Sequence, residues 1–545
     1  MATITQVPET KAETTTETKT EAVPDAAKHL VEVDNVAFAD AIARSNINPW
    51  SKRMFQLYFF CLVATLNSCI NGYDGSLMNA INAMDSYRGK FDMKPTGAAT
   101  GFVFAIYTVG NIAGSFAAGP LTDTWGRRWG MFIGAIIIII GTCIQAPAES
   151  MAQFKGGRFV LGFGVAMSAT AGPSYIAEIA HPAYRGLLTG MYNSFWFIGS
   201  IPAAWITYGT ELHYADNDAR QWRIPLWLQM TFSGFIAASV FFLPESPRWL
   251  IANGRQEEAL EVITKYHGDD NPDSPLVQLT YREMQELISK EGSDKRWWDY
   301  SDLVKTRAAR WRITMVWSMS FFGQWSGNAA VSYFLPVMLK QAGIDDVQTQ
   351  LMLNGVISVI SFIGAMIGST LVDKVGRRKM LFGASCSFVL WFVLLTALSA
   401  RYNGSGEKHG SNATIAMIYF FGFSFSIAFT PFQALYPVEC LNFENRAKGM
   451  ASYNFWVNIA AFFNQYVTPI GLGDVTWRFY FLYIAWDTFQ AIFIYLFYVE
   501  TKDRTLEELT EIFEAPNPKK ESLKRAKVVL VENRGITNVM EVVEA

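Results

Sequence analysis

The sequence predicts an all-α membrane protein with twelve transmembrane helices in two six-helix halves. Three observations indicate this fold. The chain is 51% hydrophobic and only 17% charged over 545 residues, whereas soluble domains carry about 25% charged residues. Twelve apolar runs of about 20 residues are long enough to cross a bilayer. One short charged segment lies between apolar runs and occurs twice, which indicates duplication.

The expected spans divide evenly around a hydrophilic stretch. They lie at 55–80, 98–120, 129–147, 152–177, 186–208, 224–243, 312–340, 349–372, 379–400, 413–437, 447–470 and 478–499. The stretch between the sixth and seventh spans contains two amphipathic pieces, RQEEALEVITKYHG and YREMQELISKEG, which predict helices.

These runs predict five parts of the chain. They are a cytoplasmic tail at 1–53, a first half at 54–243, an intracellular helical linker at 244–306, a second half at 307–499 and a cytoplasmic tail at 500–545. Residues 1–53 and about 513–545 are polar, and we expect them to be disordered.

The repeated segment reads GPLTDTWGRR at 119–128 and STLVDKVGRR at 369–378. Four of the residues that the copies share recur 250 positions apart (373 − 123 = 250): Asp123, Gly126, Arg127 and Arg128 in the first copy, and Asp373, Gly376, Arg377 and Arg378 in the second. Each copy separates two apolar runs. We therefore expect the two halves to share one internal plan.

The distribution of basic residues predicts the orientation in the membrane. The loops after the second, fourth, sixth, eighth and tenth spans hold the basic residues, so the positive-inside rule places these loops and both termini in the cytoplasm. Both N-x-S/T sequons, at Asn403 and Asn412, then fall outside the cell and are candidate glycosylation sites. Without a cleavable signal peptide, the first span is expected to act as the insertion signal, and we expect a multi-pass protein of the plasma membrane.

Several ordered motifs resemble the sugar-porter branch of the major facilitator superfamily. The resemblance covers roughly residues 55–512 and includes both D-x-x-G-R-R segments. Its other motifs are GRFVLGFG at 157–164, PSYIAEIAHPAYRG at 173–186, PESPRWL at 244–250, QWSGN at 324–328, YPVECLNFENRAKG at 436–449 and VETKDRTLEEL at 499–509. It implies the major facilitator fold and secondary transport by alternating access.

The resemblance also implies a cytoplasmic gate between the two halves. The motif residues that match it are Asp123, Arg127, Arg128, Glu178, Arg185, Glu245, Asp373, Arg377, Arg378, Glu439, Arg446 and Glu500. Helical spacing does not place Glu178 beside Arg185, so we expect each glutamate to pair with an arginine of the D-x-x-G-R-R loops. The alternative is that the arginines only obey the positive-inside rule, but that rule does not explain why the acidic residues recur.

Asp74 and Arg158 are an expected ion pair inside the membrane. Asp74 lies about 19 residues into the first span and Arg158 opens the fourth, so both reach a similar depth. An ionisable pair in a bilayer is a functional hypothesis by default. The matching residues of proton-linked sugar porters imply proton coupling here; the alternative is a structural ion pair or a helix cap.

The solute site is expected at the midplane between the halves. Amides and hydroxyls bind sugar hydroxyls, and aromatic rings cover the apolar sugar faces. The candidates are Asn193, Trp196, Gln324, Trp325, Asn328, Tyr333, Trp456 and Asn458. Each aromatic residue has packing or interface anchoring as its alternative role.

Two segments narrow the expected branch. NGYDGSLMNAI at 71–81 and QWSGNAAVSYF at 324–334 look like those of fungal lactose and cellodextrin permeases. Hexose carriers have a glutamine where Gly323 stands and a tryptophan where Ala434 stands. We therefore expect a roomier pocket and a disaccharide as the solute.

The leading prediction is proton-coupled import of a disaccharide by a monomer in the lipid bilayer. The alternatives are a facilitative sugar uniporter, a sugar sensor, and a carrier of another metabolite on the same scaffold. No basic stripe indicates nucleic-acid binding. No metal-ligand cluster, nucleotide loop or nucleophile elbow is present, so we expect neither a metal, a cofactor nor an enzyme.

Overall fold

The computed structural model describes residues 45, 48–215, 218–291, 300–402, 408–442, 446–502, 504, 506–523, 526–533 and 536–543. The chain divides into two compact units, of which one is Asn35–Leu523 and the other combines Met1–Asp34 with Lys524–Ala545. The membrane-length helices belong to the first unit. Most of the expected tail at 1–53 lies outside the described residues.

The first half of the helical unit follows the expected apolar runs. Its helices are α2 (Lys52–Ala83), α4 (Ala98–Trp125), α5 (Arg127–Gln145), α6 (Met151–Ile179) and α7 (Arg185–His213), and its sixth span joins α8 (Arg220–Leu228), α9 (Met230–Ser239) and η2 (Val240–Phe242). Two short elements connect them, α3 (Asp85–Phe91) and η1 (Pro182–Tyr184).

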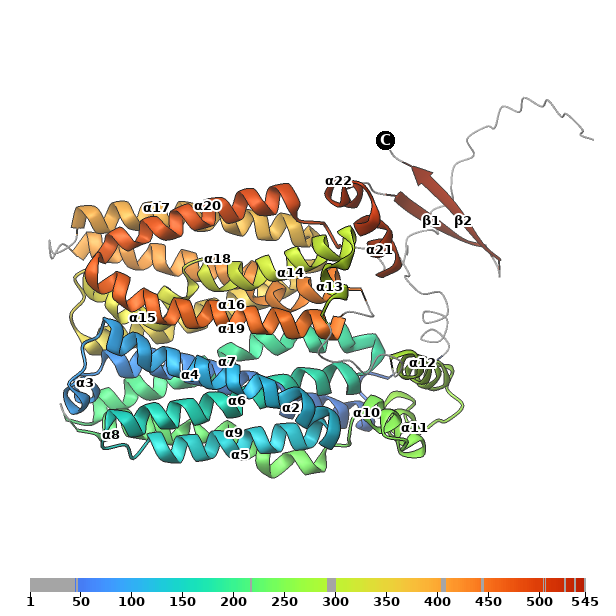
Figure 1. Cartoon of the computed structure of the whole chain (residues 1–545), viewed down its shortest axis with the longest axis horizontal. Coiled ribbons are helices and arrows are strands. Elements are labelled where there is room, and N and C mark those ends of the chain that lie inside the picture. The colour runs from blue at the N-terminus through green and yellow to red at the C-terminus, as the bar shows by residue number, and fades with distance from the viewer. Residues whose placement is uncertain are drawn as a thin grey trace, which may run out of the picture. The chain divides into compact units, whose positions relative to one another are not determined.

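The second half repeats this plan with one broken helix. Its seventh span consists of α14 (Arg307–Trp325) and α15 (Asn328–Gln341). The following spans are α16 (Val347–Val375), α17 (Arg377–Tyr402), α18 (Lys408–Cys440), α19 (Arg446–Asp474) and α20 (Tyr480–Phe497), with η3 (Thr476–Phe479) before α20. Figure 1 shows the long helices of both halves running side by side.

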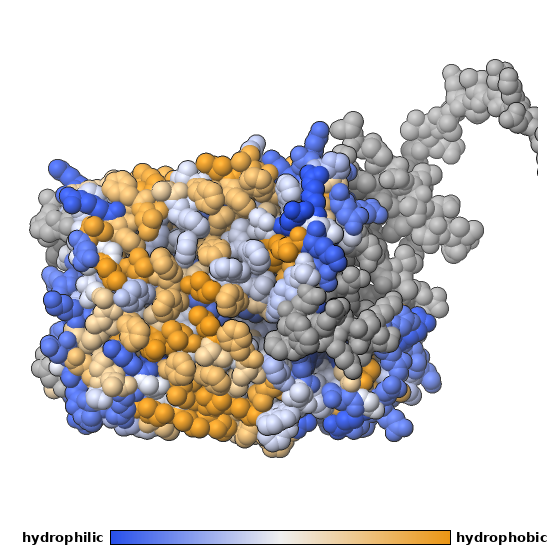
Figure 2. All heavy atoms as spheres, viewed as in Figure 1, coloured by the Kyte–Doolittle hydropathy of each residue, from blue (hydrophilic) through white to orange (hydrophobic). Residues whose placement is uncertain are grey.

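Nine helical stretches of the described residues are long and apolar enough to cross a membrane. The other three expected spans, α7, α14–α15 and α19, fall short because they are broken or contain more polar and small residues. A broad apolar band covers the middle of the face shown in Figure 2, and the blue hydrophilic residues collect at the two ends of the bundle. The protein is therefore a multi-pass membrane protein.

Short helices cover one end of the bundle, which we call the linker end (Figure 1). They are α10 (Pro247–Ala252), α11 (Gln256–His267), α12 (Pro275–Glu291) and α13 (Asp302–Lys305) from the central stretch, and α21 (Leu506–Glu514) and α22 (Pro518–Ser522) from the C-terminal segment. α11 and α12 lie where the two amphipathic pieces predict helices. A small core that includes Leu250, Ile263 and Val277 holds α10, α11 and α12 together.

The C-terminal segment contains more structure than the sequence analysis expected. Besides α22, strands β1 (Ala526–Asn533) and β2 (Ile536–Val543) pair antiparallel, with Ala526 opposite Val543 and Asn533 opposite Ile536. The prediction of a disordered segment from about 513 was wrong here because it weighed polarity alone. Both strands are rich in valine, a β-branched residue that favours strands.

The two halves are joined towards the opposite end of the bundle, which we call the far end. α4 packs against α19 and α7 packs against α16. The Gly97 N–H donates to the Pro469 carbonyl (3.1 Å), and Asn79 Nδ2 of α2 donates to Asn354 Oδ1 of α16 (2.9 Å). One hydrophobic cluster also extends from Leu77 of the first half into α14–α20 of the second. The halves are therefore closed against each other at the far end.

Candidate functional site

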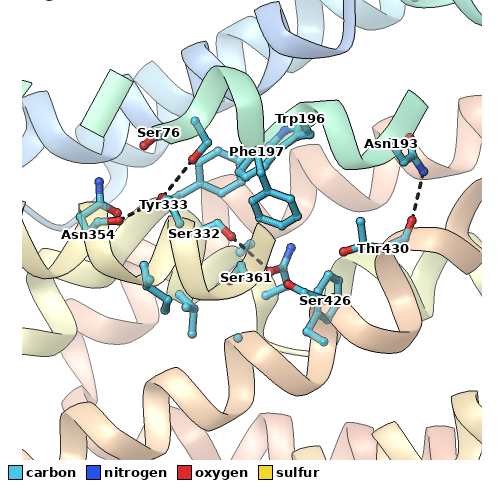
Figure 3. Close-up of a pocket in the computed structure, with 18 of the residues that line it drawn as sticks. Ser76, Asn193, Trp196, Phe197, Ser332, Tyr333, Asn354, Ser361, Ser426 and Thr430 are labelled. Carbon is cyan, nitrogen blue, oxygen red and sulfur yellow. Dashed lines mark hydrogen bonds between the residues drawn. The ribbon is translucent and has the colours of Figure 1, made fainter. Parts of the chain in front are cut away.

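A cavity of about 210 Å³ lies between the two halves. Helices α2 and α7 of the first half and α14, α15, α16 and α18 of the second line it. Its residues are Ser76, Asn193, Trp196, Phe197, Ser200, Gln324, Asn328, Ala329, Val331, Ser332, Tyr333, Asn354, Ile357, Ser358, Ser361, Gly422, Phe425, Ser426, Thr430 and Gln433. Hydroxyls, amides and aromatic rings make up most of this lining (Figure 3).

Polar stripes on two helices form one side of the cavity. α16 presents Asn354, Ser358 and Ser361, and α18 presents Ser426, Thr430 and Gln433. Both sets have the spacing i, i+4, i+7, which places three side chains on one helix face. The sequence analysis missed all six, although this polar periodicity within apolar runs is a signal that could have found them.

The break in the seventh span places two predicted residues at the cavity. α14 ends one residue after Gln324 and α15 begins at Asn328. Gly327 has φ +87°, a left-handed conformation that favours glycine, and a Cβ there would lie 2.3 Å from Phe392 Cζ. Broken helices of this kind form solute sites in transporters because they expose backbone groups at mid-membrane depth.

Five of the eight predicted solute residues line the cavity: Asn193, Trp196, Gln324, Asn328 and Tyr333. Asn193 Nδ2 also donates to the Thr430 carbonyl (3.2 Å), which links the two halves. In Figure 3, Trp196 and Tyr333 lie close together at one side of the cavity and Asn193 lies at the other.

The other three predicted solute residues do not line it. The Trp325 indole donates to the Ala460 carbonyl (3.0 Å) and packs against Trp486. Trp456 packs against Trp317 and Phe321, and Asn458 is half-buried on α19. The two tryptophans therefore stabilise helix packing in this structure.

The cavity is not enlarged at Gly323 as the sequence analysis expected. A Cβ on Gly323 would lie 3.0 Å from Gln433 Cδ, so the Gln433 side chain fills the space that the glycine leaves. Ala434 is exposed and lies outside the lining. The argument for a roomier pocket therefore fails at both positions.

Two buried polar atoms in the lining have no hydrogen-bond partner among the described residues, Ser76 Oγ and Asn354 Nδ2. Their side chains are 3% and 4% exposed. Leaving such groups unsatisfied costs free energy. Each can therefore form a hydrogen bond with a polar group that enters the cavity.

Asp74 and Arg158 form the predicted ion pair, and both are almost completely buried, at 3% and 2% exposure. Gln229 Nε2 donates to Asp74 Oδ1 (2.8 Å), and Gln145 in turn donates to Gln229 (2.8 Å). The guanidinium of Arg158 lies over the Tyr107 ring, 4.8 Å from its centre. A buried charge pair persists only with such additional partners.

The ion pair lies next to the cavity, because its carboxylate partner Asp74 is on α2. Gly75 and Ser76 follow Asp74 directly, and Ser76 lines the cavity. A Cβ on Gly75 would lie 3.3 Å from Trp196 Cζ2 and 3.4 Å from Tyr333 Cε1. One turn of α2 therefore connects the carboxylate of Asp74 to two aromatic side chains of the lining.

The repeated segments form matching ion pairs at the linker end. Arg127 Nε donates to Glu178 Oε2 (3.0 Å) in the first half, and Arg377 Nη2 donates to Glu439 Oε1 (2.7 Å) in the second. These are the expected partners, but each pair joins helices of one half. The expected gate between the halves is not formed by these pairs in this conformation.

A second carboxylate in each half caps the helix that follows the repeat. Glu245 accepts the Arg127 N–H (3.1 Å) at the start of α5, and Glu500 accepts the Arg377 N–H (2.8 Å) at the start of α17. These backbone N–H groups have no partner within their helices, and the helix dipole favours an anion there. Burial raises the pKa of Glu245 above its usual value.

The glycine of each repeat permits this close approach. Gly126 and Gly376 both have φ +98°, and a Cβ would lie 2.6 Å from Glu245 Oε2 and 2.7 Å from Glu500 Oε2, respectively. The residues that follow the two glutamates, Ser246 and Thr501, also have matching roles, which the sequence analysis missed. Ser246 Oγ donates to Glu178, and Thr501 Oγ1 donates to Glu439 Oε2 (2.6 Å).

The remaining predicted gate residues lie around these pairs. Asp123 accepts from Arg127 (3.0 Å) and is 71% exposed. Arg128 and Arg378 donate to the carbonyls of Phe241 (3.3 Å) and Tyr495 (2.7 Å). Arg185 interacts electrostatically with Arg248, Glu283 and Glu178, and Arg446 donates to the Leu441 carbonyl (3.4 Å). The side chain of Asp373 lies outside the described residues.

One of the two sequons can be located. Asn412 is exposed near the start of α18, at the far end of the bundle. Asn403 lies outside the described residues.

This arrangement of helices and paired motifs matches a known family. The sequence profile described as "Sugar (and other) transporter" matches residues 60–513. The chain belongs to the sugar (and other) transporter family. It is therefore a transporter and not an enzyme.

Curated members of this family are similar over most of the chain. A quinate permease of Neurospora terricola is 29% identical over 501 residues, which cover 87% of this chain and 92% of the relative. The MFS-type transporter criB of Aspergillus cristatus is 28% identical, over 83% of this chain and 92% of the relative.

Solved structures share the fold. The proton:xylose symporter XylE, bound to 6-bromo-6-deoxy-D-glucose, superposes with a TM-score of 0.69 at 20% identity, over 84% of this chain and 99% of that chain. A partially occluded inward-open conformation of XylE from E. coli gives 0.68 at 20% identity, over 82% and 99%. The major facilitator fold of this sugar-porter family protein is thereby confirmed.

The expected likeness to fungal lactose and cellodextrin permeases is not supported. Several similar relatives are named quinate permeases or probable quinate permeases, and these names do not support the likeness to lactose and cellodextrin permeases. The two segments at 71–81 and 324–334 hold eleven residues each, which is too little to decide the branch against relatives that match over about 500 residues.

Proposed function

We propose that this transporter couples the movement of a small polyhydroxylated solute to the movement of a proton by alternating access. The observation that best supports this proposal is the buried Asp74–Arg158 pair next to a cavity rich in hydroxyl and amide groups. A carboxylate inside the membrane is energetically costly, and such residues usually have a function where they occur. The names of the quinate permease and the proton:xylose symporter agree with such a role.

Asp74 is the proposed proton acceptor. A proton on the carboxylate removes its negative charge and with it most of the attraction to Arg158. Arg158 retains its contact with the Tyr107 ring, while α2 is free to move against Trp196 and Tyr333 of the cavity. Because Asp74 and Ser76 lie on the same turn of α2, protonation and solute binding favour the same rearrangement.

The linker end is proposed to face the cytoplasm. Arg127, Arg128, Arg377 and Arg378 lie there, as the positive-inside rule requires. The far end, which is closed in this structure, then faces outward, and the conformation described is inward-facing. In the outward-facing conformation the linker end closes, and we propose that Arg185 and Arg446 then help to join the two halves.

The proposed solute is a single-ring compound. A volume of 210 Å³ is below the range of roughly 300–1,000 Å³ that is usual for drug-sized ligands. Gln433 fills the space beside Gly323 in which a roomier pocket was expected. This size argument favours compounds such as quinate and monosaccharides over disaccharides.

Two observations favour different single-ring solutes. The names of the relatives support quinate, a carboxylic acid. The twenty lining residues include no lysine, arginine or histidine, which supports an uncharged monosaccharide as the second candidate because a buried carboxylate needs a cationic partner.

An uptake panel tests the proposal. Cells that lack their own carriers express the full chain and receive quinate, xylose, glucose, lactose or cellobiose at pH 5 and pH 7.5. We expect uptake of one single-ring solute, faster at pH 5, with alkalinisation of a weakly buffered medium. Uptake without alkalinisation at either pH would refute proton coupling, and uptake of disaccharides alone would refute the size argument.

A further inference from the structure

Helix α20 contains a second buried carboxyl group, Asp487, that the proposed mechanism does not use. Its exposure is 0%. Both carboxylate oxygens lack a hydrogen-bond partner among the described residues. Asp74, by contrast, has Arg158 and Gln229 as partners. Asp74 and Asp487 therefore have opposite environments.

Neutral groups surround Asp487. Tyr483 lies one turn before it and Gln490 one turn after it on the buried face of α20. Gln490 Nε2 donates to Ser385 Oγ of α17 (2.9 Å), and Gln490 Oε1 lacks a partner among the described residues. These groups can donate or accept hydrogen bonds, but none of them can neutralise a carboxylate.

The basic residues of the neighbouring elements lie at the ends of the bundle. α20 packs against α17, α14 and η3. Their basic residues are Arg377, Arg378, Lys379 and Arg401 of α17, Arg307, Arg310 and Arg312 of α14, and Arg478 of η3. Ser385 of α17 and Phe322 of α14 face α20 at mid-depth. At 1.5 Å per residue, Lys379 lies about 9 Å along α17 from Ser385. Arg312 lies about 15 Å along α14 from Phe322.

Hydrogen-bonding groups connect this region to the solute cavity. The Tyr483 hydroxyl lies 3.4 Å from Thr468 Oγ1, which donates to Asn464 Oδ1 (2.7 Å). Asn464 Nδ2 donates to the Gln324 carbonyl, and the Gln324 side chain lines the cavity. The broken helix α14–α15 is thereby linked to the face of α20 that contains Asp487.

We propose that Asp487 is a second proton-binding site of this chain and that it is occupied in the conformation described here. An ionised carboxylate with no cation in a dry interior is so unfavourable that the group is neutral instead. The reaction is a simple exchange, in which the carboxylic acid releases its proton to water and becomes a carboxylate. Release is proposed to accompany a movement of the α14–α15 break, because the Asn464–Thr468–Tyr483 contacts link that break to this face of α20.

Infrared spectroscopy of the purified full-length protein tests this proposal without any solute. The wild type at pH 7.5 is expected to show the C=O stretch of a protonated carboxylic acid that lacks strong hydrogen bonds. Asp487→Asn should remove this band, whereas Asp74→Asn, the matched control, should leave it in place. In Asp487→Glu the band should persist at a shifted frequency, which guards against loss of the signal through misfolding.

Transfer to D2O distinguishes a proton-binding site from a permanently protonated structural acid. We expect the band to shift as deuterium replaces the proton while the protein samples both conformations. A wild-type spectrum in which Asp487→Asn removes no band, or a band that does not shift in D2O after hours at room temperature, would overturn the proposal. Neither result depends on whether the protein transports a sugar or quinate.

Discussion

Arg127 pairs with Glu178 of its own six-helix half, with 3.0 Å between Nε and Oε2. Arg377 and Glu439 repeat this relationship in the second half. Each pair ties the start of one helix to the end of another within the same half. The duplicated motif therefore stiffens each half, which suits a mechanism in which two rigid halves rock against each other.

Glu178→Gln should destabilise the first half. It leaves the Arg127 guanidinium, whose side chain is 16% exposed, without its buried carboxylate, at an expected cost of roughly 2–3 kcal/mol. Thermal unfolding of the purified protein measures this cost. Asp123→Asn removes another acidic partner of Arg127; the Asp123 side chain is 71% exposed, so this change should cost less than about 1 kcal/mol. Equal losses in the two variants would contradict the assignment.

Gly101→Ala should disfavour the conformation in which the far end is closed. A Cβ at this position of α4 would lie 2.6 Å from the Tyr466 carbonyl oxygen of α19, across the contact between the halves. Overpacking of this kind costs about 1–3 kcal/mol, which shifts a conformational equilibrium roughly five- to hundredfold. A cysteine introduced at the far end should then react faster with an impermeant maleimide.

Gly119→Ala is the matched control for this measurement. It lies on the same helix and has no atom within 4 Å of its added Cβ. If both variants change the labelling rate equally, helix propensity and not the contact between the halves is responsible.

The attachment of α11 to the bundle should weaken in acid. His267 Nε2 lies 3.0 Å from the Ile179 carbonyl, and its ring is 5.4 Å from that of His181. Burial lowers the pKa of His181 from 6.5 to about 4 and that of His267 to about 3. The detached segment therefore binds protons that the attached one does not, so the stabilisation is complete above pH 6.5 and is lost as the pH falls towards 4.

Hydrogen exchange of the α11 amides at pH 7.5 and pH 5 measures this effect. For His181 alone, the lowered pKa corresponds to a loss of roughly 3 kcal/mol in the free energy of attachment once the pH is below both pKa values. His267→Gln should reduce the pH dependence, whereas His213→Gln at an exposed position should not. Protection of α11 that is unchanged at pH 5 in the wild type would contradict the prediction.

Gln433→Ala should widen the cavity beside Gly323. The variant removes the side chain that fills this space and deletes an amide from the lining. We expect the KM for the single-ring solute to rise roughly tenfold, since one hydrogen bond is worth about 1 kcal/mol or more. We also expect disaccharides to begin to compete for uptake. Gln348→Ala, at an exposed position of α16, should change neither, and competition by disaccharides in the wild type would contradict the size argument.

The fold and the ion pair could be predicted from the sequence because both leave strong signals. Twelve apolar runs and a repeated charged motif allow few other architectures, and Asp74 and Arg158 stand out as charges within apolar runs. The matching roles of Glu245 and Glu500 follow from their equivalent places after the sixth and twelfth spans.

The solute cavity was harder to predict because its lining depends on the rotation of each helix. Serines such as Ser358 are common in membrane helices, where they donate to the carbonyl four residues earlier, as Ser358 does to Asn354. Trp325 directly follows Gln324 in the sequence, but consecutive residues of a helix point about 100° apart, and Trp325 packs against Trp486 instead of lining the cavity. Asp487 was overlooked because no basic residue at a similar depth marks it as one half of an ion pair, as Arg158 does for Asp74.

Solute accumulation by Asp74→Asn tests the central claim most directly. The variant keeps the shape of Asp74 but cannot take up a proton, and it is compared with the wild type in proteoliposomes, using the solute that the uptake panel identifies. We predict that accumulation driven by an inward proton gradient is lost, while exchange of labelled for unlabelled solute without a gradient continues. Full accumulation by Asp74→Asn would contradict the proposal that Asp74 couples proton and solute movement.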